Sequence, residues 1–175
     1  MGILICGLNG AGKSSIGRML AGRISYQFID NEDLFFPKKD SSYEFSGSRS
    51  KEEVIRLLEN MIEKNDQFIF AAVKGDYGEK LLSKLDLIVL IEVPRAVRLQ
   101  RVYDRSFQKF GERILEGGDL YEREKSWFSL AENRSEDYTE KWLSNVLCPV
   151  IRIDGTKALD ENVEYLAKVI QQSVH

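Results

Sequence analysis

The most constraining feature of the sequence is a glycine-rich stretch near its start, where an apolar run passes directly into a helical pattern. Residues 3–6 are Ile-Leu-Ile-Cys, and residues 7–14 are Gly-Leu-Asn-Gly-Ala-Gly-Lys-Ser. A short, uninterrupted apolar run is typical of a central parallel strand that is buried on both faces. After the glycines, Ile16, Leu20 and Ile24 recur at helical spacing. The sequence therefore predicts a strand, a glycine-rich turn and a helix.

Strands and helices alternate along the rest of the chain. Further strands are predicted at 26–30, 68–73, 85–94 and 149–154. Helical patterns cover 51–64, 95–110 and 159–170, and a polar helical region covers 120–145. Residues 35–50 contain a proline and many serines, which predicts an exposed loop. Strands separated by helices favour the doubly wound α/β class, and the chain shows no linker, so we expect one domain over residues 1–175.

Composition argues against several classes of function. The net charge of −3 over 175 residues gives no overall basic field to attract nucleic acid. Two cysteines are too few for a disulfide framework or a Cys-rich zinc site, and the one histidine is the terminal His175. No apolar run approaches the ~20 residues of a membrane span, and the N-terminus lacks a signal-peptide pattern. We therefore expect a cytoplasmic protein without a nucleic-acid or membrane partner.

The stretch 7–14 fits the pattern G-x-x-x-x-G-K-[ST] at every fixed position. In this motif backbone N–H groups surround a phosphate, and the helix N-terminus adds a favourable dipole. Lys13 would reach the β- and γ-phosphates, and the Ser14 hydroxyl would bind Mg²⁺. The alternative is an ordinary glycine-rich turn followed by a Lys-Ser pair by chance. The predicted strand before the motif and the predicted helix after it disfavour this alternative, because the motif requires both. The residues expected to bind ATP are Gly7, Asn9, Gly10, Ala11, Gly12, Lys13, Ser14 and Ser15.

With this motif and this order of elements, the chain resembles the P-loop small-molecule kinases of the nucleoside monophosphate kinase, shikimate kinase and gluconate kinase type. The resemblance implies a three-layer α/β/α P-loop NTPase fold with a five-stranded parallel sheet in the order 2-3-1-4-5. It also implies Mg-ATP as phosphoryl donor, an acceptor-binding segment at about 31–64 and a lid at about 105–120.

Three carboxylates, Asp30, Glu32 and Asp33, cluster at the carboxyl end of the second predicted strand. Carboxylates there could hold Mg²⁺, or orient or deprotonate an acceptor hydroxyl. Shikimate and gluconate kinases are similar, with two acidic residues separated by one other residue, which match Asp30 and Glu32. We expect Asp30 to act in catalysis and metal binding, and Glu32 and Asp33 to bind the acceptor. The alternative is a solvated strand end or an N-cap for a short following helix.

The third predicted strand ends without a carboxylate, and Lys74, Gly75 and Asp76 lie just beyond it. This resembles the shikimate kinase pattern, which lacks a carboxylate within that strand and has glycines after it. The resemblance supports Asp30 as the metal partner and implies that Lys74 and Gly75 contact the acceptor. A plain transition from strand to loop explains the same residues.

Arginines at three- and four-residue spacing, Arg98, Arg101 and Arg105, share one face of the predicted helix 95–110. Lid arginines of the resembling kinases close over ATP and stabilise the charge on the transferred group. The resemblance thus implies catalytic roles for Arg101 and Arg105, and Arg113 is the next candidate for such a role. Glycines at 111, 117 and 118 would serve as hinges. The alternative is a solvated, charged helix.

After the last predicted strand, Asp154 and Gly155 match the turn that lies beside the adenine in the resembling kinases. A simple turn before the closing helix is the other interpretation. The sequence alone does not decide between a turn beside the adenine and a simple turn before the closing helix.

Taken together, these features predict an ATP-dependent phosphotransferase that moves the γ-phosphoryl group of Mg-ATP to a small-molecule acceptor. The acceptor is a hydroxylated metabolite or a nucleotide, with a slight preference for the metabolite, and the protein is a monomer or homodimer. The alternative is a P-loop NTPase that acts as a nucleotide-dependent switch or binding module without such an acceptor. A GTPase version has no N-K-x-D sequence to support it.

Overall fold

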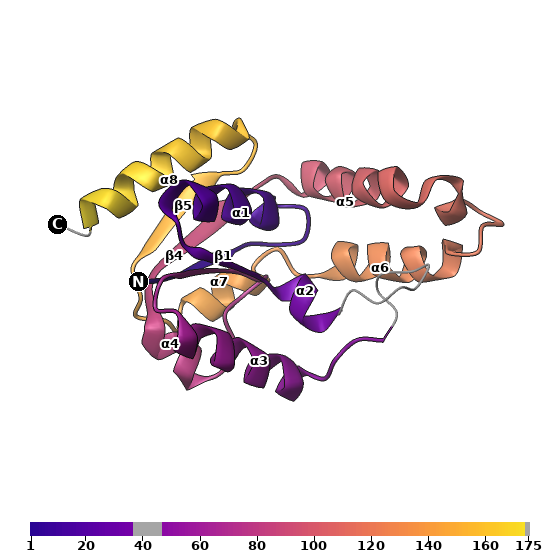
Figure 1. Ribbon diagram of the computed structural model, residues 1–175. Coiled ribbons are helices and arrows are strands. Elements are labelled where there is room, and N and C mark those ends of the chain that lie inside the picture. The colour runs from indigo at the N-terminus through magenta and orange to yellow at the C-terminus, as the bar shows by residue number, and fades with distance from the viewer. Residues whose placement is uncertain (37–46, 174–175) are drawn as a thin grey trace.

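The protein is built on a five-stranded parallel sheet with the strand order β2-β3-β1-β4-β5. The computed structural model describes residues 1–36 and 47–173 (Figure 1). The strands are β1 (Gly2–Cys6), β2 (Gln27–Asp30), β3 (Phe68–Ala71), β4 (Leu85–Glu92) and β5 (Val150–Asp154). The predicted fold class and strand order are confirmed. Strands β3 and β4 end two residues earlier than the apolar runs suggested.

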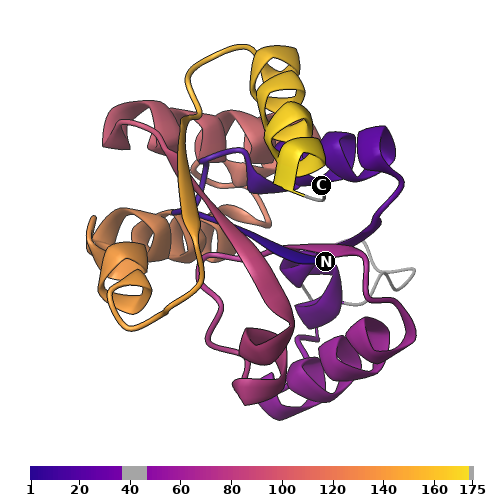
Figure 2. The same cartoon turned by 90° about the vertical axis from the view of Figure 1, so that its left-hand side faces the viewer.

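Helices cover both faces of this sheet. They are α1 (Lys13–Ile24), α2 (Asn31–Phe35), α3 (Lys51–Lys64), α4 (Glu79–Lys84), α5 (Arg95–Phe110), α6 (Tyr121–Asn133), α7 (Tyr138–Leu143) and α8 (Leu159–Ser173), with a 3₁₀ turn, η1 (Gly111–Ile114). Figure 1 shows α1 and α8 on one face and α3, α4 and α7 on the other, and Figure 2 shows the same layers from the side. Over the described part of the chain, none of the helices has both the length and the apolar character needed to cross a membrane.

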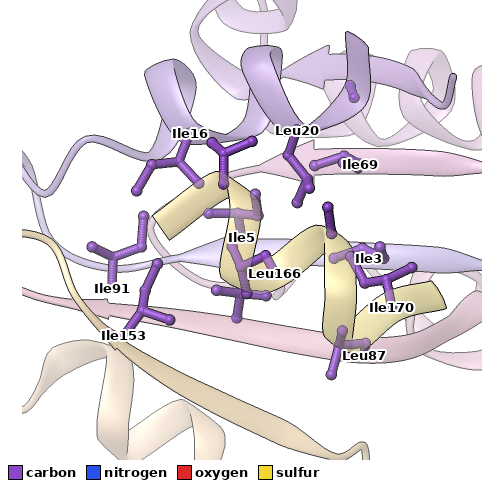
Figure 3. Close-up of a cluster of buried hydrophobic side chains, with 14 of the residues drawn as sticks. Ile3, Ile5, Ile16, Leu20, Ile69, Leu87, Ile91, Ile153, Leu166 and Ile170 are labelled. Carbon is purple, nitrogen blue, oxygen red and sulfur yellow. The ribbon is translucent and has the colours of Figure 1, made fainter. Parts of the chain in front are cut away.

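The core consists of two apolar clusters, one on each face of the sheet. Strand β1 supplies both, because its side chains alternate: Ile3 and Ile5 enter one cluster, and Leu4 and Cys6 enter the other. All four side chains are inaccessible to solvent. Figure 3 shows the first cluster, in which β1 packs against the apolar stripes of α1 and α8, including Ile16, Leu20, Leu166 and Ile170. This two-sided burial fixes the position of the turn that follows β1.

Helices α5 and α6 extend beyond the sheet as a hairpin (Figure 1). The hairpin has a small apolar cluster of its own, formed by Ile114 and Leu120 with Phe110 and Phe128. The predicted lid at about 105–120 corresponds to the end of α5, η1 and the turn into α6. The predicted helical region 120–145 is divided into α6 and α7, because the backbone at Arg134 is extended (φ −67°, ψ 125°) and ends α6.

The segment after β2 forms a short helix, α2. The sequence analysis considered such a helix, with an N-cap at the acidic strand end, as the alternative to a functional role of the carboxylates. The Asp30 carboxylate accepts a hydrogen bond from the Glu32 N–H, so Asp30 is the N-cap of α2. Residues 37–46 of the predicted loop and of the predicted acceptor-binding segment lie outside the described residues. Helix α3 begins with a capping box in which Ser50 and Glu53 bond each other's backbone N–H.

Candidate active site

The turn between β1 and α1 has the backbone geometry of an anion cradle. Gly10 and Gly12 have φ values of 81° and 96°, in the left-handed region where only glycine is unstrained. A Cβ on Gly10 would lie 2.2 Å from the carbonyl oxygen of Arg98, whereas a Cβ on Gly12 would meet nothing within 4 Å. Gly12 is also the N-cap of α1 and provides no side-chain cap. The first N–H groups of α1 therefore remain to be satisfied by a bound anion.

Lys13 lies at the centre of this turn. Its ammonium group donates a hydrogen bond to the carbonyl oxygen of Leu8 at 3.1 Å, so the side chain folds back across the loop. Burial lowers the pKa of Lys13 to about 8, and the nearby carboxylates of Glu32 and Asp30 oppose that shift. A polyphosphate placed here would supply the negative charge that stabilises the protonated form.

One cavity of about 260 Å³ joins the phosphate loop to the acidic end of β2. Of the predicted site residues, Asn9, Gly10, Lys13, Ser14, Asp30, Glu32 and Arg105 line it. The cavity is also lined by residues that the sequence analysis did not identify as candidates: Asn31, Phe35, Phe36, Trp127 and Arg134. Cations, carboxylates and aromatic rings from five parts of the chain thus meet in one small space.

The two carboxylates of this cavity have different surroundings. Asp30 is tied to the start of α2 through one oxygen, as described above. Glu32 forms an ion pair with Arg105 of α5, with 3.2 Å between Arg105 Nη2 and Glu32 Oε1. This contact joins the acidic segment to the α5/α6 hairpin. Asp33 is exposed and is not among the residues that line the cavity.

Arg134 is held in the cavity wall by two groups. Its guanidinium donates to the Asn9 side-chain oxygen and lies 5.1 Å from the centre of the Tyr138 ring. No local pattern marks this residue, because its partner Asn9 is 125 positions away in the sequence. Its extended backbone directly after α6 distinguishes Arg134, but this feature is visible only in the structure and could not have been found from the sequence.

Lys74 and Gly75 have structural contacts of their own and do not line the cavity. The Lys74 ammonium lies 3.3 Å from an Asp76 oxygen and 4.4 Å from the centre of the Tyr138 ring. Gly75 packs so closely that an added Cβ would lie 2.7 Å from the Trp142 ring. Their predicted contact with the acceptor finds no support in these positions.

Three arginines of α5, Arg98, Arg101 and Arg105, face three different environments. Arg98 is buried: it donates to the carbonyl oxygens of Val93 and Asn9 and to both carboxylate oxygens of Glu136. Arg101 donates two hydrogen bonds, at 3.0 and 3.1 Å, to the Gly155 carbonyl oxygen. Only Arg105 of the three lines the cavity. In this geometry Arg101 supports the loop at Gly155, and its catalytic role stays a prediction.

The Arg101 contact brings the Asp154–Gly155 turn to α5. Within the turn, Asp154 accepts hydrogen bonds from the N–H and the hydroxyl of Thr156, which lower its pKa. A Cβ on Gly155 would lie 2.5 Å from Ile91 and 3.0 Å from the Ala11 carbonyl oxygen. The turn thus packs directly on the phosphate loop. Arg113 is elsewhere, in an exposed ion pair with Asp119 at the tip of the hairpin.

Oxygen ligands suitable for Mg²⁺ come from Ser14 and Asp30, which line the same cavity. Mg²⁺ is typically bound through one or two protein oxygens together with substrate phosphates and water. Among residues 1–36 and 47–173, no three His, Cys, Asp or Glu side chains come together as a metal cluster. The residues present therefore fit a metal that is bound jointly with phosphate.

A sequence model of shikimate kinase matches residues 9–141, which is more than half of the chain. The chain belongs to the shikimate kinase family. The matched range includes the phosphate loop from Asn9, the acidic residues after β2 and the hairpin with Trp127 and Arg134. Family and fold together support the kinase and nucleotide-binding character that the P-loop motif predicts.

Three individual proteins are similar to the chain in sequence or in fold. The chain is 31% identical over 170 residues to a Bacillus subtilis (strain 168) protein, "Uncharacterized protein YqaC", with 93% of each chain covered. The crystal structure of shikimate kinase from Aquifex aeolicus is similar, with a TM-score of 0.55, 17% identity and 99% and 98% of the two chains covered. The YorR protein of Bacillus subtilis, in complex with phosphorylated GDP, has a TM-score of 0.59, 18% identity and 100% and 98% covered. At these identities the two structures show that the fold is shared.

Proposed function

We propose that the protein is an ATP-dependent kinase that transfers the γ-phosphoryl group of Mg-ATP to a hydroxyl group of a small molecule. The observation that carries this proposal is the cavity, in which Lys13 and Ser14 face Asp30, Glu32 and Arg134. Phosphate-binding groups and acceptor-binding groups therefore share one space. Membership of the shikimate kinase family supports the same reaction class.

Each residue would have a distinct part in the transfer. The loop amides and Lys13 bind and orient the phosphates. Ser14 would hold the metal directly and Asp30 through a bound water, and the metal would neutralise charge on the phosphates. The acceptor oxygen forms a bond to the γ-phosphorus as the bond to the β,γ-bridging oxygen breaks. The hydroxyl proton passes to Asp30, whose Oδ1 caps α2, so we assign the contact to Oδ2. Glu32 orients the acceptor, and Arg105 keeps Glu32 in place.

The Asp154–Gly155 turn is the proposed contact for the adenine, and Arg101 holds that turn against α5. Packing of Gly155 on Ala11 supports this arrangement, because it places the turn beside the phosphate loop. Organisation as one domain over 1–175, a cytoplasmic location and a monomeric or homodimeric state remain predictions.

An ATP-consumption screen tests the proposal. The purified protein, with Mg²⁺ and ATP, is incubated separately with nucleosides, nucleoside monophosphates and hydroxylated metabolites. We expect ADP production that depends on one acceptor class, is lost in Lys13→Ala and is retained in Lys168→Ala, a matched change at an exposed lysine of α8. Unchanged turnover in Lys13→Ala would refute the mechanism. Tight ATP binding without acceptor-stimulated turnover would instead favour a nucleotide-dependent switch.

A further inference from the structure

The aromatic residues of the cavity limit what kind of acceptor fits it. Phe35 and Phe36 enter from the end of α2, and Trp127 enters from α6. All three side chains are partly exposed and line the cavity. Ala71, Ala72 and Val73 add further apolar lining. An acceptor covered only with hydroxyl groups would lose hydration against these surfaces and gain no hydrogen bonds in return.

Polar groups are confined to particular parts of the lining. Lys13 and Ser14 are assigned to the phosphates and the metal, and Asp30 to the metal and the transferred proton. Asn9 and Arg105 are paired with Arg134 and Glu32, which leaves Glu32, Asn31 and Arg134 to recognise the acceptor. Asn31 already accepts a hydrogen bond from the Tyr77 hydroxyl through Oδ1, so its amide N–H₂ group is the part that can donate to a ligand. Arg134 is fixed by Asn9 and Tyr138, which gives a positioned donor for a carbonyl or phosphate oxygen.

Flat heterocycles satisfy both parts of this lining. A nucleobase offers π-faces for the aromatic rings and carbonyl and amino groups at its edge for Asn31, Glu32 and Arg134. The attached sugar supplies the hydroxyl that the transfer requires. The cavity volume of about 260 Å³ lies just below the ~300 Å³ at which ligand sites usually begin, so the acceptor is a small molecule.

We propose that the phosphoryl acceptor carries a nucleobase, as a nucleoside or a nucleoside 5′-monophosphate, and that Trp127 stacks on the base. The proposal rests on the proposed function only for the identity of the reaction. Binding of the base is a separate property, and it can be measured without turnover.

Fluorescence of Trp127 provides that measurement. The chain has two tryptophans, and the second, Trp142, packs against Gly75 and does not line the cavity. With Mg-ADP at saturation, so that the donor site is filled, adenosine, guanosine, cytidine, thymidine and their 5′-monophosphates are titrated with excitation at a wavelength the bases do not absorb. We expect at least one of them to quench the emission, with the quenching absent in Trp127→Phe. Ribose, ribose 5-phosphate and shikimate should leave the emission unchanged.

Substitutions separate stacking from general packing. Trp127→Leu keeps apolar volume but removes the ring and should weaken the quenching ligand's binding about tenfold, as measured by calorimetry. Leu130→Ala, at an exposed position one turn along α6, should leave the affinity within twofold. Arg134→Gln should weaken a monophosphate more than its nucleoside if the phosphate contacts Arg134, and equally if Arg134 contacts the base.

The outcomes distinguish this proposal from the kinase assignment. Phosphorylation of shikimate or a sugar, with no response to any base-bearing compound, would overturn the acceptor class and leave the kinase intact. Quenching by a nucleoside without acceptor-dependent ADP production would retain the base site and refute the kinase. Absence of any quenching by all eight compounds would overturn the inference.

Discussion

Replacing Arg98 by methionine tests whether this buried side chain fixes the phosphate loop. Arg98 is 3% exposed and lies between the carbonyl oxygens of Val93 and Asn9, each 3.2 Å from a guanidinium nitrogen. It also pairs with Glu136 at 2.6 and 2.7 Å. Methionine keeps the apolar stem and removes every donor. The substitution therefore changes the hydrogen bonds of the loop more than its packing.

The expected loss follows from these contacts. A hydrogen bond to a charged group contributes about 1.5 kcal/mol or more, so the two carbonyl contacts together contribute about 3 kcal/mol. Glu136 is 55% exposed and can be rehydrated, so its pair adds only about 0.5 kcal/mol. We expect the free energy of unfolding of Arg98→Met to fall by about 3.5 kcal/mol. ADP affinity should fall about tenfold, because the Asn9 carbonyl is no longer held.

Urea denaturation and calorimetric titration of ADP measure the two effects. Arg95→Met is the matched control, since Arg95 also contacts Glu136, at 3.5 Å, but is 47% exposed. Its free energy of unfolding should change by no more than about 0.5 kcal/mol. If Arg98→Met unfolded at the same urea concentration as Arg95→Met and bound ADP as tightly, Arg98 would not hold the loop.

Three further predictions concern backbone strain and ionisation. Gly10 and Gly12 both have positive φ, but only a Cβ at Gly10 would meet backbone, at 2.2 Å. In urea denaturation the free energy of unfolding should therefore fall by about 2 kcal/mol more in Gly10→Ala than in Gly12→Ala. Equal losses in the two variants would contradict this explanation. Ser25→Gly should stabilise the protein by about 0.5 kcal/mol, because Ser25 has φ 58°, and a lower urea midpoint would argue against strain there. Burial lowers the pKa of Lys13 from 10.5 to about 8, so between these pH values the unfolded chain binds more protons and this contribution to stability rises with pH. Burial raises the pKa of Cys6, which opposes this trend above pH 9, so the difference between wild type and Lys13→Met in the free energy of unfolding is the measurement. That difference should shift in favour of the wild type from pH 7 through 8.5 to 10; a constant difference would refute the assignment.

The fold could be predicted from the sequence because its signals are local. Apolar runs such as 3–6 mark strands buried on both faces, and the motif at 7–14 ties the first strand to an anion-binding turn. The strand order came from the resemblance to P-loop kinases and not from periodicity. The break between α6 and α7 was not predicted, since polar residues on either side keep a helical composition through Arg134.

The site was only partly predictable, for a physical reason. Lys13 and Ser14 directly follow the glycine turn, and Asp30 is the last residue of β2, so their positions follow from local geometry. Trp127 and Arg134 reach the cavity only through tertiary packing of the hairpin, which leaves no local pattern. Spacing placed Arg98 with the other arginines of α5, but it could not show that the start of α5 packs on the phosphate loop and buries this one side chain.

Asn9 is shared by the two halves of the cavity. Arg98 holds its backbone oxygen, and Arg134, from the wall assigned to the acceptor, holds its side chain. A ligand that draws Arg134 toward itself or fixes it more firmly therefore acts on the loop that receives the nucleotide. By thermodynamic reciprocity, the factor by which an acceptor changes nucleotide affinity equals the factor by which the nucleotide changes acceptor affinity. Through this one asparagine, the strength of the coupling between the two substrates becomes a property that a single side chain can tune.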